Sequence, residues 1–257
     1  MSAPTILAQA GSDFFRDRSE TNDSCVADNG FFRDRSRSGD SCVANNGFCP
    51  NWIVHHLDRY VSPFWQHLFL VVVSVGLGFA IAFALALAAH RQRRLVGPIT
   101  QVTGILYTIP SLAFFFLLLP ITGRGNTTAL IALTAYTLLI LFRNIVDGLD
   151  AVPDEARDAG RGMGLTYRQL LWRVELPLAL PTIMAGLRIA ATTTVGLAAL
   201  ATFAGAGGLG DQMASQKEFI SNIAVGGALC VLMAVGLDAI LLGVQRLLTP
   251  WTRVRTA

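Results

Sequence analysis

Five long apolar segments, separated by polar stretches, set the pattern of this chain. They cover residues 68–89, 96–119, 127–142, 178–203 and 223–248. A helix needs about 20 apolar residues to cross the hydrocarbon core of a bilayer, and most of these segments reach that length. The pattern predicts five transmembrane helices. The third segment is short, so it either borrows flanking polar residues such as Asn126 and Arg143 or lies deep within the protein.

One long polar passage, from Pro153 to Pro181, separates hydrophobic segments, here the third and the fourth. It predicts a first short helix over residues 154–161, which ends at Gly162 and Gly164 because glycine takes the left-handed conformation at little cost. Such a short helix is marginal in water unless it docks against another surface. The passage therefore indicates a docking surface and not a catalytic site.

A second helix is predicted after the glycines, over residues 167–174. Thr166 stands three residues before Gln169, which is the spacing of a capping box at a helix N-terminus. We expect Leu176-Pro177 to end this helix and to open the fourth apolar segment.

The composition places these helices in a membrane. The hydrophobic residues make up 53% of the 257-residue chain and the charged residues only 14%, against about 25% charged residues in a typical soluble domain. The sequence therefore predicts an all-α integral membrane protein.

The basic residues predict the orientation, because short loops rich in Lys and Arg stay in the cytoplasm. The loops after the first and third segments are basic, whereas those after the second and fourth carry only Arg124 and Lys217. This predicts an N-out, C-in topology with the loop 143–177 in the cytoplasm. The net charge of +3 is spread over separate loops, which argues against a nucleic-acid surface.

The N-terminal 50 residues contain a tandem duplication, in which residues 14–30 recur as residues 31–47 with 13 of 17 positions identical. Its polar composition favours a loosely ordered tail outside the membrane. There Cys25, Cys42 and Cys49 could form disulfides. The tail is either a duplicated segment without a role in the core activity or a regulatory, partner-binding one.

Residues 51–66 mix aromatic and charged side chains, as interfacial segments do, and predict an elbow helix leading into the transmembrane domain at 67–248. Residues 249–257 are predicted to form a cytoplasmic tail. His55, His56 and His67 lack a Cys or carboxylate at the spacing of a ligand set, so no metal site is predicted.

Two motifs point to a pathway or gate. Tyr107, Pro110 and Ser111 lie in the middle of the second segment, where a proline kinks a helix and builds either a pathway wall or a packing contact. Gly205, Gly207 and Gly208 belong to a G-x-G-x-x-G pattern, but this follows a membrane helix and no strand, so we expect an outer hinge or gate and no nucleotide site.

Two ionisable residues lie inside apolar segments. Arg188 is ten residues beyond Leu178, and Asp238 is ten before Leu248, so both lie about 15 Å from the cytoplasmic ends of their helices. Charges inside a bilayer are costly unless they are paired or face water. We predict a structural ion pair between them; Arg188 lining the pathway is the alternative.

The polar passage resembles the signature of a known family. The membrane permeases of binding-protein-dependent ABC importers carry E-A-A-x3-G-x9-I-x-L-P, and here the same spacing joins Asp158-Ala159-Gly160, Gly164, Val174 and Leu176-Pro177. Tyr107 to Ser111 and Gly205 to Asp211 look like the glycine betaine, choline and proline branch, whose members import osmoprotectants. The similarity covers about Trp65 to Leu248.

This resemblance implies a type I importer permease in a prokaryotic inner membrane. Its partners would be ABC ATPase subunits, a second permease subunit and an extracytoplasmic solute-binding protein; the chain itself would bind no cofactor, since ATP and Mg²⁺ belong to the ATPase. The first short helix would be the coupling helix, with Arg157 and Arg161 on its rim. The residues expected to dock on the ATPase are Asp154, Glu155, Arg157, Asp158, Ala159, Gly160, Arg161 and Gly164.

Other functions remain open at this point. The solute could be a glycine betaine, choline, carnitine or proline type of osmolyte, or another solute such as an amino acid. A self-sufficient channel or secondary carrier would be expected to show inverted repeats and intramembrane ion ligands. A membrane-anchored enzyme would need a nucleophile, a base and an orienting group together, which the sequence does not offer.

Overall fold

The computed structural model describes residues 50–215 and 220–251, and the regular structure in these ranges is helical. The tandem duplication and its three cysteines lie outside the described residues. The long helices are α4 (Val61–Arg91), α7 (Asn126–Asp150), α10 (Leu176–Leu200) and α12 (Ile220–Leu248). The shorter elements are α3 (Pro50–His55), η2 (Leu57–Tyr60), η3 (Arg93–Leu95), α5 (Val96–Thr108), α6 (Ser111–Thr122), α8 (Asp154–Gly162), α9 (Tyr167–Leu170), η4 (Leu171–Glu175), η5 (Ala201–Ala204) and α11 (Leu209–Ser215).

Four helical stretches are long and apolar enough to cross a membrane: Leu57–Arg91, Asn126–Asp150, Tyr167–Ala204 and Ile220–Leu248. The pair Arg93–Thr108 and Ser111–Thr122, bent by 97°, supplies a fifth if it counts as one span. The second predicted span is therefore broken into two helices. The third predicted span is longer than expected, because the helix takes in both Asn126 and Arg143.

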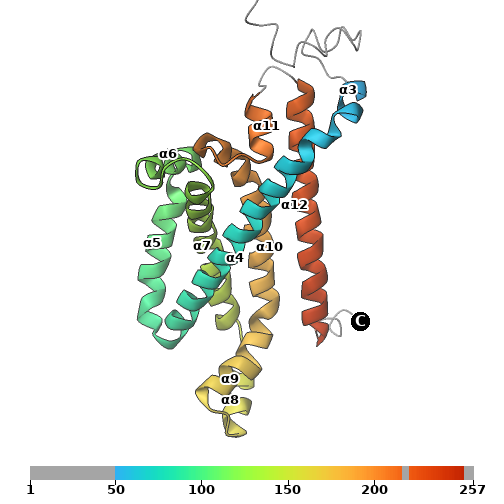
Figure 1. The fold of residues 1–257 in the computed structure, drawn as a ribbon. Helices are drawn as coiled ribbons and strands as arrows, with labels where there is room; N and C mark the ends of the chain where they lie inside the picture. The colour runs from blue at the N-terminus through green and yellow to red at the C-terminus, as the bar shows by residue number, and fades with distance from the viewer. Residues whose placement is uncertain (1–49, 216–219, 252–257) are drawn as a thin grey trace, which may run out of the picture.

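The long helices run in alternating directions (Figure 1). α4 begins at the end of the molecule that carries α11, and α8 and α9 lie at the opposite end; these are called here the α11 end and the α8 end. α12 starts at the α11 end and finishes at the α8 end. α4 has 31 residues, about 46 Å at 1.5 Å per residue, and crosses the bundle obliquely.

The predicted elbow helix over residues 51–66 is divided. α3 and η2 cover its first part, and residues from Val61 onward belong to α4. Pro63 explains the division, because a proline fits in the first turn of a helix, where its missing N–H has no intrahelical partner, and not in a helix interior. The Tyr60 side chain is buried and its hydroxyl donates to the Asn222 side chain of α12.

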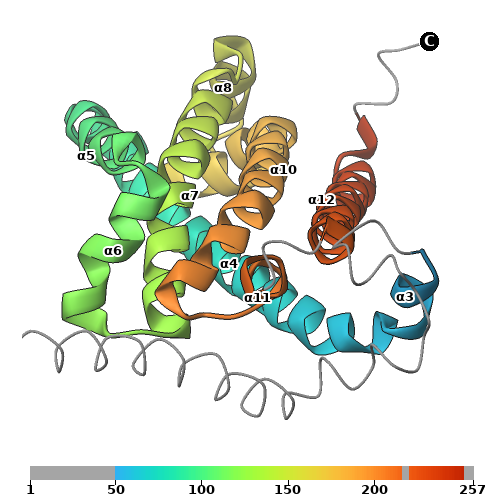
Figure 2. The same cartoon turned by 90° about the horizontal axis from the view of Figure 1, so that it is seen from above.

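Two apolar clusters form the core. One lies toward the α11 end and joins α4, α6, α7, α10 and α11 through residues such as Leu70, Phe115, Leu133, Val195 and Leu209. The other lies toward the α8 end and includes Ala86, Phe142, Ile145, Leu149 and Ile183. α12 stands at the edge of the bundle and packs mainly on α10 and α11 (Figure 2).

Glycines bring the long helices close together, as small residues do in membrane bundles. A Cβ added at Gly78 of α4 would lie 1.9 Å from Thr137 Oγ1 of α7, and one at Gly186 of α10 would lie 2.3 Å from Asn144 Cβ of α7. α7 is thus the helix against which α4 and α10 both pack.

Candidate functional site

α8 is a nine-residue helix that begins directly after Pro153. Asp154 and Glu155 occupy its first turn and Arg161 its last, which matches the positive N-terminus and negative C-terminus of the helix dipole. The predicted first helix is confirmed, with an end one residue later than expected. It leaves the bundle at the α8 end, below α10 in Figure 1.

The bend after α8 is built as the sequence predicts. Gly164 has a φ of +79°, in the left-handed region, and Leu165 N–H donates to Gly160 O over 3.2 Å. Thr166 N–H then donates to Gln169 Oε1 over 2.9 Å, as in a capping box. The polar passage therefore folds through local hydrogen bonds.

The prediction that Leu176-Pro177 ends the second helix is wrong. α9 continues through the π-helical turn η4 into α10, and Pro177 lies in the first turn of α10. A π turn shifts the hydrogen-bond register by one residue, so a residue without an N–H donor is accommodated there. The polar passage is consequently continuous with the fourth span.

The docking residues predicted on α8 do not all face outward. Asp154, Glu155, Asp158, Ala159, Arg161 and Gly164 are exposed, whereas Gly160 is buried and Arg157 is half-buried. A Cβ at Gly160 would lie 2.6 Å from Leu170 Cδ1, so the glycine marks the packing face of α8 on α9. The expectation that Arg157 lies on the rim is wrong, because a buried carboxylate draws it inward.

That carboxylate is Glu175, which is only 4% exposed. Arg157 Nε donates to Glu175 Oε1 over 3.0 Å, Nη2 donates to Leu149 O over 2.8 Å, and Nη1 donates to Asp154 Oδ1 over 2.9 Å. Burial lowers the pKa of Arg157, but the hydrogen bonds to Asp154 and Glu175 outweigh it and hold the pKa above its usual value. Arg157 is therefore charged at any physiological pH.

His90, at the end of α4, completes this group. His90 Nε2 lies 2.8 Å from Glu175 Oε2, and its ring stacks on Tyr167 at 6.3 Å between centroids. Neither His90 nor Glu175 is among the predicted site residues. The available signal was a lone carboxylate beside the apolar start of the fourth span, a position where a charge needs partners.

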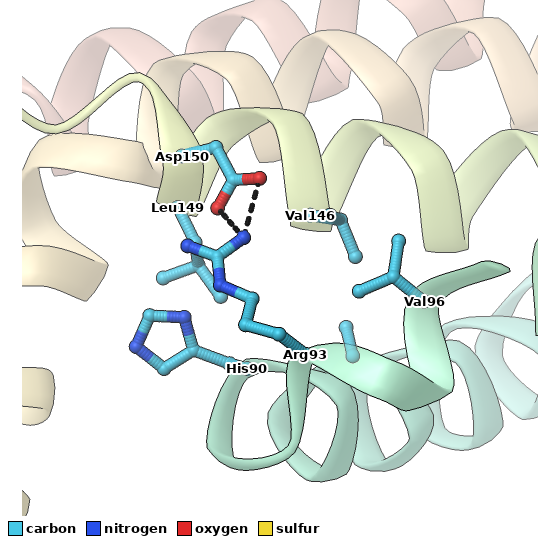
Figure 3. A pocket seen from close by; sticks show the side chains of 7 residues that line it. His90, Arg93, Val96, Val146, Leu149 and Asp150 are labelled. Atoms are coloured by element: carbon cyan, nitrogen blue, oxygen red, sulfur yellow. Dashed lines mark hydrogen bonds and ion pairs between the residues drawn. The ribbon is translucent and has the colours of Figure 1, made fainter.

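A second ion pair lies beside His90 (Figure 3). Arg93 Nη1 lies 2.7 Å from Asp150 Oδ2 and 2.5 Å from Oδ1, so the turn after α4 is linked to the end of α7. These two side chains are 56% and 41% exposed. A cavity of 360 Å³ at the α8 end is lined by His90, Arg93, Asp154, Arg157, Arg161, Leu165, Tyr167, Leu170 and Glu175.

The predicted kink at Pro110 is a full break. Ile109 and Pro110 are extended between α5 and α6, and Tyr136 of α7 donates its hydroxyl to the freed Ile109 carbonyl over 2.5 Å. The ring of Tyr107 packs edge-on against Tyr136 at 6.0 Å. Ser111 is the first residue of α6.

The glycine loop has a defined conformation. Gly205, Gly207 and Gly208 all have positive φ, from +72° to +82°. Gln66 of α4 holds the loop, because its Nε2 donates to Ala206 O over 2.7 Å and its Oε1 accepts from Gly208 N–H over 3.3 Å. The loop is also tied to the α6–α7 turn, since Gly125 N–H donates to Ala204 O over 2.9 Å.

Arg188 and Asp238 meet between α10 and α12. Arg188 Nε donates to Asp238 Oδ1 over 2.7 Å and Nη2 donates to Oδ2 over 2.8 Å, so the contact is bidentate. The predicted ion pair is present, and the two side chains keep 28% and 34% of their surface exposed. The pair lies on helices other than those that carry Tyr107, Pro110 and Ser111.

One of the three histidines considered for a metal site, His67, has a backbone partner. His67 is fully buried and its Nε2 lies 3.0 Å from Val195 O. In the ranges 50–215 and 220–251, no three His, Cys, Asp or Glu side chains are grouped as metal ligands.

The chain has relatives among transport proteins. It is 38% identical over 167 residues to the choline transport system permease protein OpuBD of Bacillus subtilis (strain 168), covering 64% of this chain and 74% of the relative. It is 38% identical over 207 residues to the osmoprotectant import permease protein OsmW of Salmonella typhimurium (strain LT2), covering 78% and 96%.

The same fold occurs in a solved transporter. A chain of the MetNI methionine ABC transporter, in an inward-facing conformation, superposes with a TM-score of 0.63 at 24% sequence identity, over 72% of this chain and 95% of that one. Residues 61–254 match the family model described as binding-protein-dependent transport system inner membrane component. The chain therefore belongs to this family and is a membrane-spanning permease component of an ABC importer, with ATP hydrolysis assigned to a separate chain.

Proposed function

We propose that this permease subunit passes a small osmoprotectant of the choline or glycine betaine type, delivered by a solute-binding protein. The names of the two relatives, choline permease and osmoprotectant permease, support the substrate class. The two matches cover 64% and 78% of this chain.

We further propose that α8 docks on the ATPase, and its exposure carries this proposal. α8 is nine residues long, protrudes from the α8 end, and turns Asp154, Glu155, Asp158, Ala159 and Arg161 outward. A helix this short is marginal by itself and depends on packing against other surfaces. Its inner side packs on α9 and η4, which leaves the outer side for the ATPase, the chain that would bind ATP and Mg²⁺.

The charge distribution supports a cytoplasmic α8 end. This end carries Arg91 at the end of α4, Arg93 and Arg94 in η3, Arg161 in α8, Arg168 in α9, and Arg246 near the end of α12. Cytoplasmic loops carry such an excess of basic residues.

The edge helix α12 supports pairing with a second permease subunit. Its outer face is apolar and exposed, with Val231, Leu232, Val235 and Ile240 each more than 60% exposed. In a bilayer such a face meets either lipid or another apolar helix. We propose that the pathway is formed between two permease subunits, with Tyr107, Pro110, Ser111 and the glycines 205, 207 and 208 as pathway or gate residues.

The test is ATP-driven uptake in proteoliposomes that contain the permease, its ATPase and its binding protein, with labelled choline, glycine betaine and methionine offered separately. We expect uptake of the first two. The Asp158→Arg variant should lose both ATPase association and uptake. The control variant Asp58→Arg, at the α11 end, should still associate with the ATPase. Uptake of methionine alone would contradict the substrate class, and an ATPase that still binds the Asp158→Arg variant would contradict docking at α8.

A further inference from the structure

We propose that Glu175 is a positioning residue that holds α8 to the ends of α4 and α7, so that a displacement of α8 moves these helices together with α10. This inference rests on the proposed docking of the ATPase at α8. It concerns how the docked helix is connected to the bundle.

The geometry places one carboxylate between two partners from distant parts of the chain. Glu175 Oε1 accepts from Arg157 Nε of α8 at 3.0 Å, and Oε2 lies 2.8 Å from His90 Nε2 at the end of α4. The side chains of His90, Arg157 and Glu175 are 8%, 14% and 5% exposed. One buried carboxylate therefore sets the relative positions of three elements: α8, the C-terminal end of α4 and the start of α10.

Arg157 extends this connection to α7. Its Nη2 donates to Leu149 O, in the last turn of α7, over 2.8 Å, and Nη1 donates to Asp154 over 2.9 Å. A helix C-terminus leaves carbonyl groups without intrahelical partners, and the Leu149 carbonyl accepts from Arg157 as well as from Val152 N–H, over 3.4 Å. One guanidinium thus joins α8, α7 and Glu175 through three directed hydrogen bonds.

Directed bonds matter here because the other attachments of α8 are few. The helix packs mainly on α9 and η4, with Gly160 against Leu170. Apolar contacts are non-directional and let a short helix slide, whereas a planar guanidinium fixes the direction of its partners. Removing one partner of a buried ion pair also leaves the other charge uncompensated.

The nearby Arg93–Asp150 pair serves as a matched control. It lies at the same end of the bundle, and Figure 3 shows it beside His90, but it is half-exposed, and its ion pair joins the turn after α4 to α7 and not to α8. Exposed ion pairs contribute little, so Asp150→Ala should leave the connection of α8 intact.

The experiment measures solute uptake and ATP hydrolysis on the same proteoliposomes that contain the whole transporter. For Glu175→Ala and Arg157→Ala we expect uptake per ATP hydrolysed to fall about tenfold, within the range by which substitutions change coupling between sites. The double variant should be no worse than either single one. Glu175→Gln keeps an oxygen for Arg157 and an amide for His90, so it should keep most of the wild-type uptake per ATP hydrolysed.

An unchanged ratio in Glu175→Ala, or a fall no larger than in Asp150→Ala, would overturn the inference. If Glu175→Ala fails to assemble, Arg157→Lys replaces it, because a single ammonium cannot reach Glu175, Asp154 and Leu149 in the same geometry. A normal ratio in Arg157→Lys would likewise overturn it.

A measurement on the chain alone separates this inference from the proposed function. Spin labels at the exposed positions 91 and 158 report the distance between the end of α4 and α8. The distance distribution should broaden in Glu175→Ala and stay narrow in Asp150→Ala, whichever solute is transported. A distribution unchanged by Glu175→Ala would refute the positioning role even if ATP-driven uptake of osmolytes is found.

Discussion

Arg188 and Asp238 form a bidentate ion pair between α10 and α12, with N–O distances of 2.7 and 2.8 Å. α12 stands at the edge of the bundle and packs mainly on α10 and α11. A two-point contact between planar groups fixes the axial position and the rotation of one helix against the other. The pair therefore determines which face of α12 points away from the bundle.

Removing either partner is expected to destabilise the subunit. Asp238→Ala leaves the Arg188 charge unpaired inside an apolar span, and Arg188→Ala does the same for Asp238. The melting temperature of the purified subunit in detergent should drop in both single variants, and the double variant Arg188→Ala/Asp238→Ala should recover part of the loss. Single effects that simply add in the double variant would contradict a direct interaction.

Gly78 is expected to tolerate no side chain. Gly78→Ala would place a Cβ 1.9 Å from Thr137 Oγ1, and Thr137 is buried and hydrogen-bonded to Thr134 O over 2.8 Å. Overpacking of this kind costs about 1–3 kcal/mol. Denaturation of the subunit in mixed micelles measures this free energy.

Gly76 offers the control, because it lies in the same helix and a Cβ there meets nothing within 4 Å. Gly76→Ala should be neutral or stabilising by up to about 1 kcal/mol, since alanine is the better helix former. The second change in Gly78→Ala/Thr137→Ala should restore part of the stability. Equal effects of the two glycine variants would argue against close packing of α4 on α7.

Gly164 is expected to be sensitive for its backbone conformation. A Cβ at Gly164 meets nothing within 4 Å, but φ is +79°, and the left-handed conformation costs an L-residue about 1–2 kcal/mol. Gly164→Val should therefore loosen the turn after α8 and reduce uptake per ATP hydrolysed, while the subunit still inserts. Faster hydrogen exchange over residues 154–165 would report the loosened turn directly.

The matched variant is Gly162→Ala, because Gly162 has equally open space and does not have a positive φ. Gly162→Ala should leave unchanged both the hydrogen-exchange rates over residues 154–165 and the uptake per ATP hydrolysed. Transport that is unchanged in Gly164→Val would count against a role of this turn in docking.

Tyr136 is expected to stabilise the break between α5 and α6. Its hydroxyl donates to the Ile109 carbonyl at the break, so Tyr136→Phe leaves that carbonyl without this donor at a cost of about 1–3 kcal/mol. The melting temperature should fall more than in Tyr107→Phe, where the contact with Tyr136 is made by the ring. Equal shifts would mean that the hydroxyl is not what holds the break.

Local features of the chain were readable from the sequence alone. The apolar runs gave the crossing helices, the spacing of Thr166 and Gln169 gave the capping box, and equal depth with opposite charge gave the Arg188–Asp238 pair. The crossing helices and the capping box depend on residues close together in the sequence. The ion pair follows from counting residues along two helices. The physical reason is that helix formation, capping and membrane crossing are governed by neighbours in sequence.

Only the tertiary structure decided how these parts connect. Pro110 predicted a kink, but Tyr136 from another helix contacts the Ile109 carbonyl at what is a 97° break. The sequence predicts Arg157 on the rim of α8, but Glu175, 18 positions later, draws it inward. The helix through Pro177 continues because a π turn precedes it. Buried hydrogen-bond partners are chosen by the packing of distant segments, and no local pattern contains that information.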